Sequence, residues 1–410
     1  MSSKLLRSRD VDFHYSGSVI TRACEQGIYI DLDALECAHQ ELRDVIDEDA
    51  TRLEEIAWEG ININSNNEMT RLFVDILESE DCLLTTKTGR YSFNAESMES
   101  VVTESDNPVA VECAKLVSNI RSNTSKANKL QELYAACDGE LIHPKWSHGE
   151  TYRISYNSPG ISNIPKDVRG IFKAPEGYKI VSFDYSQQEP WILFHRLRIK
   201  ELIKLTEEYQ DTYRAMGNII LGKKEITKEE RNRLKIAWLA TSYGAGVRTI
   251  ASQVGSKEFA KKFHNTINSL PQIANEHRII RANINQGNRI SDGYFGTKRE
   301  VPYYGGGYTA RAIFNGKFQI TGSEILMFAI EDIDKYLAAR HYTPEEARIY
   351  FTMHDQVLML VKDNCLNIVD DIYNLIAYQV VDDTDYEEYD SEEERTWLPF
   401  KLEQTISDTY

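Results

Sequence analysis

Apolar and polar residues recur with different periods along the chain, and these periods predict helices first and strands later. Between Leu35 and Ile56, apolar residues return every three or four positions beside an acidic face, which predicts one long amphipathic helix. Residues 65–68 have the sequence of a capping box, Ser-x-x-Glu, and predict a second helix that continues to Leu77. Residues 1–20 show no clear period, so we expect a loose lead-in there.

Further helix starts occur before residue 135. Asn94 and Pro108 are expected to open two short helices, and Lys126 to Tyr134 is expected to form another. The first 135 residues are therefore predicted to be mostly helical, and nothing in them indicates catalysis.

Two strand-like stretches, far apart in the chain, each carry an aspartate. Residues 180–183 run into Asp184, and residues 350–361 hold His354-Asp355 between two apolar runs, which predicts a β-hairpin with the acid at its tip. A strand keeps its backbone rigid, so each aspartate is expected at a fixed point on a sheet edge. A strand-to-helix corner capped by Asp184 would explain the first stretch alone. Two such aspartates are what a two-metal phosphoryl-transfer site requires, with ions about 3.5–4 Å apart.

A second capping box, at residues 227–230, predicts a helix that starts at Lys228. Residues spaced four apart share one stripe of this helix: Arg231, Lys235, Leu239 and Tyr243. Two cations one turn apart can hold successive phosphates, and the tyrosine offers a flat surface for a base or sugar. A solvated surface helix is the alternative for the cations alone; the ordered set, lying between the two aspartates, favours phosphate binding.

The remaining pattern indicates the fold class. Loops and short strands begin at Gly139, helical sequence resumes at Trp191 and continues with breaks to about Asn285, and another helix is expected from Ala310 to about Leu337. Strands near both aspartates, with helical regions before and between them, predict an α+β palm that carries two helical appendages.

Composition limits the class of protein. With 410 residues, of which 41% are hydrophobic, the chain can bury a substantial core. Its six cysteines are scattered without a CxxC pair, which indicates reduced thiols rather than a zinc site or a disulfide framework. No apolar run approaches a membrane span and no secretory signal is evident, so we expect a soluble, intracellular protein.

The net charge of −17 argues against a nucleic-acid partner, but the charge is unevenly distributed. Residues 382–394 form an acidic block, which we expect to be a solvated loop, whereas residues 223–262 and 278–311 are rich in Lys and Arg. An acidic protein can hold a basic cleft, so nucleic acid is not excluded.

Taken together, the three motifs resemble those of the family A DNA polymerases, the bacterial DNA polymerase I group. The first motif is Asp184-Tyr185-Ser186-Gln187 with Glu189, the second is Arg231, Lys235 and Tyr243-Gly244, and the third is His354-Asp355. The loop around Arg153, the helix with Arg311, Asn315 and Gln319, and thumb-like sequence between residues 27 and 97 extend the resemblance. It covers the chain from about residue 20 to its end.

The resemblance implies a right-hand polymerase fold with an antiparallel-sheet palm and a helical thumb and fingers. The expected division is 1–138 for an N-terminal segment and the thumb, 139–200 for the first part of the palm, 201–309 for the fingers and 310–410 for the second part of the palm. We expect no 3′–5′ exonuclease domain, because residues 1–20 are too few to form one.

The resemblance also implies roles at the reaction centre. Asp184 and Asp355 would bind two Mg²⁺ ions, or Mn²⁺ in their place, with the carbonyl of Tyr185 as a further ligand. Arg231 and Lys235 would hold the incoming triphosphate, and Lys235 would also protonate the leaving pyrophosphate.

Other matching residues would contact the nucleotide or the DNA. Glu189 would block a ribose 2′-hydroxyl and pair with Tyr243, and Gln187 and Tyr213 would complete the dNTP site. The expected DNA contacts are Arg153, Arg311, Asn315, Gln319 and His354. Donors of this kind suit purine N3 and pyrimidine O2, the minor-groove acceptors common to every base pair.

The sequence departs from the family pattern at several positions. Gln356 replaces the usual glutamate, Leu239 an aromatic residue beside the sugar, and Tyr213 a histidine near the triphosphate. Such departures keep open a catalytically weak or silent polymerase-like DNA-binding protein. A single-subunit RNA polymerase is a further alternative, but Glu189 argues against it because a bulky acid there would exclude ribonucleotides.

The predicted function is a template-directed DNA polymerase, a nucleotidyltransferase of DNA replication that lacks its own exonuclease. Its expected partners are primer–template DNA and dNTPs, and a separate exonuclease or a processivity factor is left open. We expect it in the cytoplasm of a bacterial or phage-infected cell, with no membrane partner.

Overall fold

A computed structural model describes residues 11–86, 88–242, 245–380 and 397–410, and the chain divides into two compact units. Unit 1 comprises 1–29, 141–162 and 172–410, and unit 2 comprises 30–140 and 163–171. The predictions made for Tyr243 and for the acidic block at 382–394 lie outside the described residues.

Unit 2 is helical, as the amphipathic pattern predicts. Its helices are α2 (Leu32–Ile56), α3 (Asn66–Thr70), a π-helical segment (Arg71–Ile76), α4 (Ala95–Glu104) and α5 (Pro108–Ala135), with 3₁₀ turns at Glu80–Cys82 and Lys166–Ile171. The predicted caps are present: Ser65 Oγ accepts from the Glu68 N–H at 3.4 Å and Asn94 Oδ1 from the Ser97 N–H at 2.9 Å.

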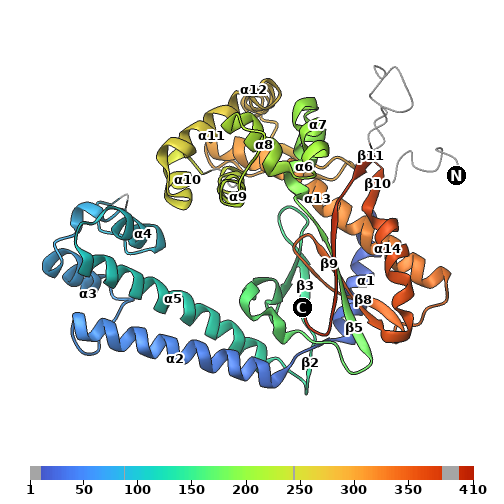
Figure 1. Ribbon diagram of the computed structural model, residues 1–410, viewed down its shortest axis with the longest axis horizontal. Coiled ribbons are helices and arrows are strands. Elements are labelled where there is room, and N and C mark those ends of the chain that lie inside the picture. Colours follow the sequence, from blue (N-terminus) through green and yellow to red (C-terminus); the bar gives the residue numbers. More distant parts are fainter. Residues whose placement is uncertain (1–10, 87, 243–244, 381–396) are drawn as a thin grey trace. The chain divides into compact units, whose positions relative to one another are not determined.

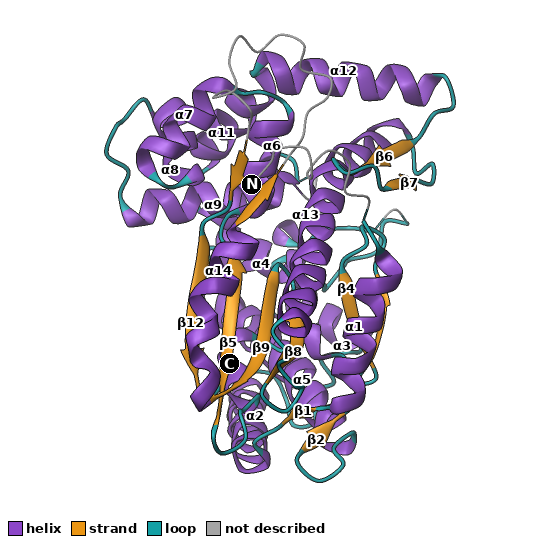
Figure 2. Ribbon diagram, turned by 90° about the vertical axis from the view of Figure 1, so that its right-hand side faces the viewer, coloured by secondary structure: helices purple, strands orange, loops and turns teal. Residues whose placement is uncertain are grey.

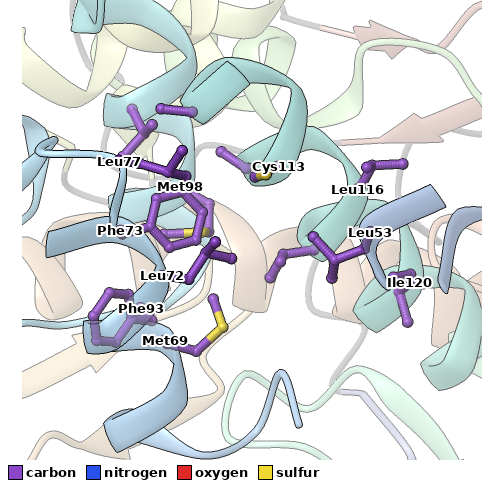
Figure 3. Packing of buried hydrophobic residues seen from close by; sticks show 14 of the residues in the cluster. Leu53, Met69, Leu72, Phe73, Leu77, Phe93, Met98, Cys113, Leu116 and Ile120 are labelled. Atoms are coloured by element: carbon purple, nitrogen blue, oxygen red, sulfur yellow. The ribbon is translucent and has the colours of Figure 1, made fainter. Parts of the chain in front are cut away.

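The core of unit 2 forms where α2, α5 and the helical turns between them pack together (Figure 3). Phe73 and Phe93 lie with ring centroids 6.2 Å apart, and Met69, Leu72 and Val117 are completely buried beside them. Burial of this apolar surface is the main stabilising term for a helical unit that contains little sheet.

Two helix predictions were wrong in extent. The short helices expected at Pro108 and at 126–134 are one helix of 28 residues, α5, because no glycine or further proline interrupts it and apolar positions continue to Leu133. The lead-in expected at 1–20 contains most of helix α1 (Phe13–Gln26), which Asp12 caps and which buries Val19 and Ile20.

The centre of unit 1 is a four-stranded antiparallel sheet in the order β12-β5-β9-β8 (Figure 2). Its strands are β5 (Tyr178–Tyr185), β8 (Ala347–Met353), β9 (Gln356–Lys362) and β12 (Leu402–Ser407). The predicted strand before Asp184 and the predicted hairpin around Asp355 are both confirmed. A short strand, β11 (Trp397–Pro399), precedes β12 in the chain.

Three helices pack on this sheet: α1, α13 (Gly306–Ala339) and α14 (Val369–Ala377) (Figure 2). The long helix α13 is buried almost continuously from Phe318 to Ile333, and the apolar run at 325–330 lies within this stretch. Gly322 allows α6 (Gln188–Arg196) to approach, since a Cβ at that position would lie 2.5 Å from Gln188 Oε1.

Helices also fill the segment between β5 and α13 (Figure 1). After α6 they are α7 (Lys200–Tyr209), α8 (Thr212–Leu221), α9 (Lys228–Ser242), α10 (Val247–Val254), α11 (Lys257–Ser269) and α12 (Pro271–Asn285). Two-stranded pairs join β1 (Ile28–Tyr29) to β2 (Leu141–Ile142), β3 (Lys145–His148) to β4 (Ile154–Asn157), β6 (Ile290–Asp292) to β7 (Lys298–Glu300), and β10 (Tyr378–Val380) to β11. In the described part of the chain, no helix has both the length and the apolarity that a membrane crossing needs.

Candidate active site

The sheet brings the two predicted aspartates to the same end of its two central strands, β5 and β9. This end of the sheet, with Asp184 and Asp355, is called the acidic edge below. Asp184, the penultimate residue of β5, is paired in register with Gln356, the first residue of β9. Asp355 directly precedes Gln356, and its carbonyl accepts a hydrogen bond from the Tyr185 N–H at 3.3 Å. His354 completes the tight turn with a left-handed φ of 55° and an exposed side chain. Asp184 and Asp355 are therefore neighbours although they are remote in sequence.

A side-chain amide contacts the Asp184 carboxylate. Gln356 Nε2 donates a hydrogen bond to Asp184 Oδ2, and the hydroxyl of Tyr410 donates to Gln356 Oε1. A glutamate at position 356, as in the family pattern, would put a second negative charge beside Asp184. Gln356 instead provides a neutral hydrogen-bond donor there.

Arg153 lies between two carboxylates. Its Nη2 forms an ion pair with Glu189 Oε1 and lies 3.4 Å from Asp355 Oδ1. Glu189 is only 8% exposed, and its burial raises the pKa of the carboxyl group, an effect that the charge of Arg153 opposes and that of Asp355 reinforces. The second oxygen of Glu189 is buried without a hydrogen-bond partner among the described residues.

The oxygen atoms at this edge fit a hard divalent cation. Asp184 and Asp355 are both partly exposed, and the one further group that the resemblance assigns to metal is the backbone carbonyl of Tyr185. Carboxylate and carbonyl oxygens are the ligands that Mg²⁺ takes in proteins. Within the described ranges, no group of three or more His, Cys, Asp or Glu side chains is arranged to hold a metal ion, so a site here would depend on these two acids.

The turn after Asp184 is tied to the start of α8. Gln187 has a left-handed backbone (φ 56°), and its Oε1 accepts hydrogen bonds from the Thr212 N–H at 2.7 Å and the Thr212 hydroxyl at 2.6 Å. Asp211 caps α8 through the Arg214 N–H at 2.9 Å. These bonds connect the first motif to the helices that follow it.

Helix α9 starts at Lys228, as predicted, and presents its polar stripe away from its buried side. Lys235 and Leu239 are exposed and Arg231 is partly exposed, whereas Leu234 and Ala237 are completely buried. Arg231 Nε forms an ion pair with Asp211 Oδ2 at 2.6 Å, so this cation is already oriented by a carboxylate at the start of α8. Tyr243, the last predicted member of the stripe, lies outside the described residues.

Tyr213 connects this stripe with the acids. The Arg231 guanidinium lies 5.3 Å from the centroid of its ring. Burial raises the pKa of Tyr213, the nearby charges of Glu189 and Asp355 raise it further, and the charge of Arg231 opposes them. Tyr213 is thus within electrostatic reach of both the acidic edge and α9.

The predicted DNA-contacting residues of α13 lie on one side of its first half. The Arg311 guanidinium lies 4.5 Å from the ring centroid of Tyr308, Asn315 is partly exposed and Gln319 is 8% exposed. Their spacing of four residues puts them on one face of the helix.

Sequence reasoning missed two residues of this site. Asp211 was readable as a helix cap, since it stands immediately before a helix, but its ion pair with Arg231 follows only from how α8 and α9 pack. Tyr410 carries no local signal, because it lies outside any helix or strand and contacts Gln356 only through the tertiary fold.

Comparisons with known proteins identify relatives of this chain. The profile of DNA polymerase family A matches residues 32–382. A DNA polymerase I of Synechocystis sp. is 27% identical over 256 residues, which cover 59% of this chain and 26% of the relative. A DNA polymerase I of Pseudomonas aeruginosa is 23% identical over 376 residues, which cover 86% of this chain and 40% of the relative. This chain therefore spans well under half the length of these relatives.

A solved structure has the same fold. It is the POL domain of Pol1 from M. smegmatis in complex with DNA primer-template and dNTP, with a TM-score of 0.81, 20% identity, and coverage of 97% of this chain and 69% of the other. The predicted α+β class, with antiparallel sheets and a polymerase-type fold, is confirmed.

Proposed function

Because the chain belongs to DNA polymerase family A, we propose that it is a template-directed DNA polymerase that adds dNTPs to a primer 3′-hydroxyl. The observation that carries this proposal is the meeting of Asp184 and Asp355 at one sheet edge, with Arg231 and Tyr213 in the adjoining helices. A fold built only for binding DNA would not need two strand-borne acids next to a cation that suits phosphate.

Family A polymerases use divalent metal ions, and we propose two Mg²⁺ ions here, with Mn²⁺ as a substitute. Asp184, Asp355 and the carbonyl of Tyr185 would hold them. Bound there, the ions would activate the primer 3′-hydroxyl and stabilise the charge on the leaving pyrophosphate. Arg153 would keep Asp355 oriented and offset part of the negative charge at the edge.

The residues of α9 would bind the incoming nucleotide. Arg231, pre-oriented by Asp211, and the exposed Lys235 would contact the triphosphate, and Lys235 would protonate the pyrophosphate. Gln187 and Tyr213 would line the same site. Glu189 would exclude a ribose 2′-hydroxyl, because its carboxylate is held in place by Arg153 and cannot withdraw easily from the space beside the sugar.

The DNA would be primer–template, the ligand that the M. smegmatis POL domain has in its structure. Arg311, Asn315 and Gln319 would contact minor-groove acceptors, with Arg153 and His354 beside them.

On this proposal, 1–138 hold the N-terminal segment and thumb, 139–200 and 310–410 the palm, and 201–309 the fingers. We also propose that these 410 residues have no 3′–5′ exonuclease activity, since the POL-domain fold accounts for 97% of them. Because the relatives named above are bacterial DNA polymerases I, we propose the cytoplasm of a bacterial or phage-infected cell as the location.

Gel-based extension of a primed template by the purified chain tests the proposal. We expect extension with dNTPs and Mg²⁺, little with rNTPs, and no shortening of a single-stranded primer. Asp355→Ala should abolish extension and leave primer–template binding intact, whereas Asp363→Ala, an exposed aspartate beyond the far end of β9, should change neither. Preferential use of rNTPs would indicate an RNA polymerase, and binding without extension in Mg²⁺ or Mn²⁺ would indicate a silent DNA-binding protein.

A further inference from the structure

Two hydrogen bonds in series reach Asp184 from the segment that follows β12. The hydroxyl of Tyr410 donates to Gln356 Oε1, and Gln356 Nε2 donates to Asp184 Oδ2. The register of β5 and β9 pairs Asp184 with Gln356, which puts their side chains on the same face of the sheet and makes the second bond a cross-strand contact.

The chemistry of the three groups determines which one donates and which one accepts in each of these two hydrogen bonds. An ionised carboxylate can only accept, so the amide must turn its NH₂ group toward Asp184 and its oxygen toward Tyr410. A phenol can donate to that oxygen, which holds the amide in the one orientation that suits the carboxylate. Glutamate at 356 could accept from Tyr410 but would have no donor for Asp184.

Tyr410 is held independently of its hydroxyl group. Its N–H donates to the Phe172 carbonyl at 3.0 Å, and its ring lies 6.4 Å from that of Phe172 and 5.8 Å from that of Phe351. Both phenylalanines are at most 1% exposed, and Thr409 forms a bridge with Lys173. Packing against the sheet therefore brings the hydroxyl to Gln356, and removal of the hydroxyl alone should leave the ring in place.

We infer that Tyr410 and Gln356 are positioning residues that orient the Asp184 carboxylate for a divalent cation. This inference rests on the proposed function, in which Asp184 is a metal ligand. The series supplies Asp184 with a neutral donor, so orientation is gained without a third negative charge at the edge. On this inference Tyr410 acts through Gln356, because its hydroxyl donates to the amide oxygen whose NH₂ group donates to Asp184.

Binding of Mn²⁺ to the purified 410-residue chain, without DNA or nucleotide, tests this by electron paramagnetic resonance of the free ion. Tyr410→Phe removes one hydrogen bond and should weaken Mn²⁺ binding about three- to tenfold, while it lowers the thermal unfolding midpoint no more than the loss of a comparable hydroxyl bond elsewhere in the chain. Tyr178→Phe is the matched control: it removes a 2.7 Å hydroxyl bond to the Glu345 carbonyl at the other end of β5 and should leave Mn²⁺ binding unchanged.

A double-mutant cycle separates positioning from general packing. In a Gln356→Ala background, Tyr410→Phe should weaken Mn²⁺ binding no further, because the amide through which it acts is gone. Additive losses, or a Tyr410→Phe effect that accompanies an unfolding midpoint clearly below that of Tyr178→Phe, would overturn the inference.

Asp184→Asn, measured in the same way, distinguishes this inference from the proposed function. If Asp184→Asn binds Mn²⁺ as tightly as the unmodified chain, the metal role of Asp184 is wrong and both proposals fall. If Asp184→Asn weakens Mn²⁺ binding and Tyr410→Phe does not, only the positioning role is overturned.

Discussion

Arg153 and Glu189 form an ion pair in which the guanidinium also lies 3.4 Å from Asp355. Glu189 belongs to α6 and Asp355 to the turn between β8 and β9, so one cation lies between acids from two separate elements. Two carboxylates that approach each other without a cation would repel, and burial of Glu189 would increase that cost. Arg153 therefore allows the two carboxylates of Glu189 and Asp355 to lie close together, in addition to its expected contact with DNA.

Removal of Arg153 should destabilise the fold. Arg153→Ala leaves the buried Glu189 carboxylate unpaired, and we expect a loss of about 3 kcal/mol in the free energy of unfolding of unit 1. Urea denaturation at pH 7 measures this loss. Adding Glu189→Gln to Arg153→Ala should recover part of it, since the amide needs no counter-charge; a double variant no more stable than Arg153→Ala would contradict the pairing as the cause.

Glu189 should decide which sugar the site accepts. Glu189→Ala opens the space beside the sugar, and we expect the preference for dNTP over rNTP to fall at least about tenfold in kcat/KM, equivalent to about 1.4 kcal/mol. Glu189→Gln keeps the size of the side chain and should retain most of the preference. Single-nucleotide incorporation with both kinds of substrate provides the measurement, and unchanged selectivity in Glu189→Ala would remove this role.

Arg231 and Arg233 lie on the same helix and provide a matched pair. Arg231 is oriented by Asp211 next to Tyr213, whereas Arg233 forms an ion pair with Glu229 on the surface. Arg231→Ala should raise the KM for dNTP about ten- to a hundredfold, because a charge-assisted contact with phosphate is lost, with primer–template affinity unchanged. Arg233→Ala should change neither quantity. Equal effects of the two substitutions would show that α9 contributes only general positive charge.

His195 should make stability depend on acid pH. Burial lowers its pKa from the ordinary 6.5 to about 4, and both ring nitrogens lack a hydrogen-bond partner among the described residues, with Trp191 4.2 Å away between ring centroids. The unfolded chain therefore binds a proton between pH 6.5 and 4 that the folded chain does not, and stability falls as the pH falls through this range.

The substitution His195→Leu isolates this contribution. Between pH 7 and 4.5 the unmodified chain should lose about 2–3 kcal/mol more unfolding free energy than His195→Leu, which has no titrating group at that position. Urea titrations at a series of pH values give the difference. Parallel pH profiles for the two proteins would mean that His195 is protonated as readily in the folded chain as in the unfolded one.

Local sequence was sufficient for the elements that carry the motifs. The apolar run before Asp184, the two runs around Asp355 and the capping box before Lys228 each describe one strand or helix, and the structure has each of them. Their information lies within a few residues, because strand propensity, turn chemistry and capping act between near neighbours. Where a local boundary was absent, as within α5, the helix continued beyond the prediction.

The sequence by itself thus determined which acids stand at strand ends and which cations share the stripe of α9. Only the tertiary structure decided which side chains those residues contact: Arg153 with Glu189, Arg231 with Asp211, and Tyr410 with Gln356. These pairs join residues from different elements, and their contacts depend on which strands pair and on how the helices pack, which the pattern of polar and apolar residues within one element does not encode. Hydrogen bonds and ion pairs act over a few ångströms. Residues that can be predicted from the sequence therefore form a site only when the fold brings their side chains within those distances.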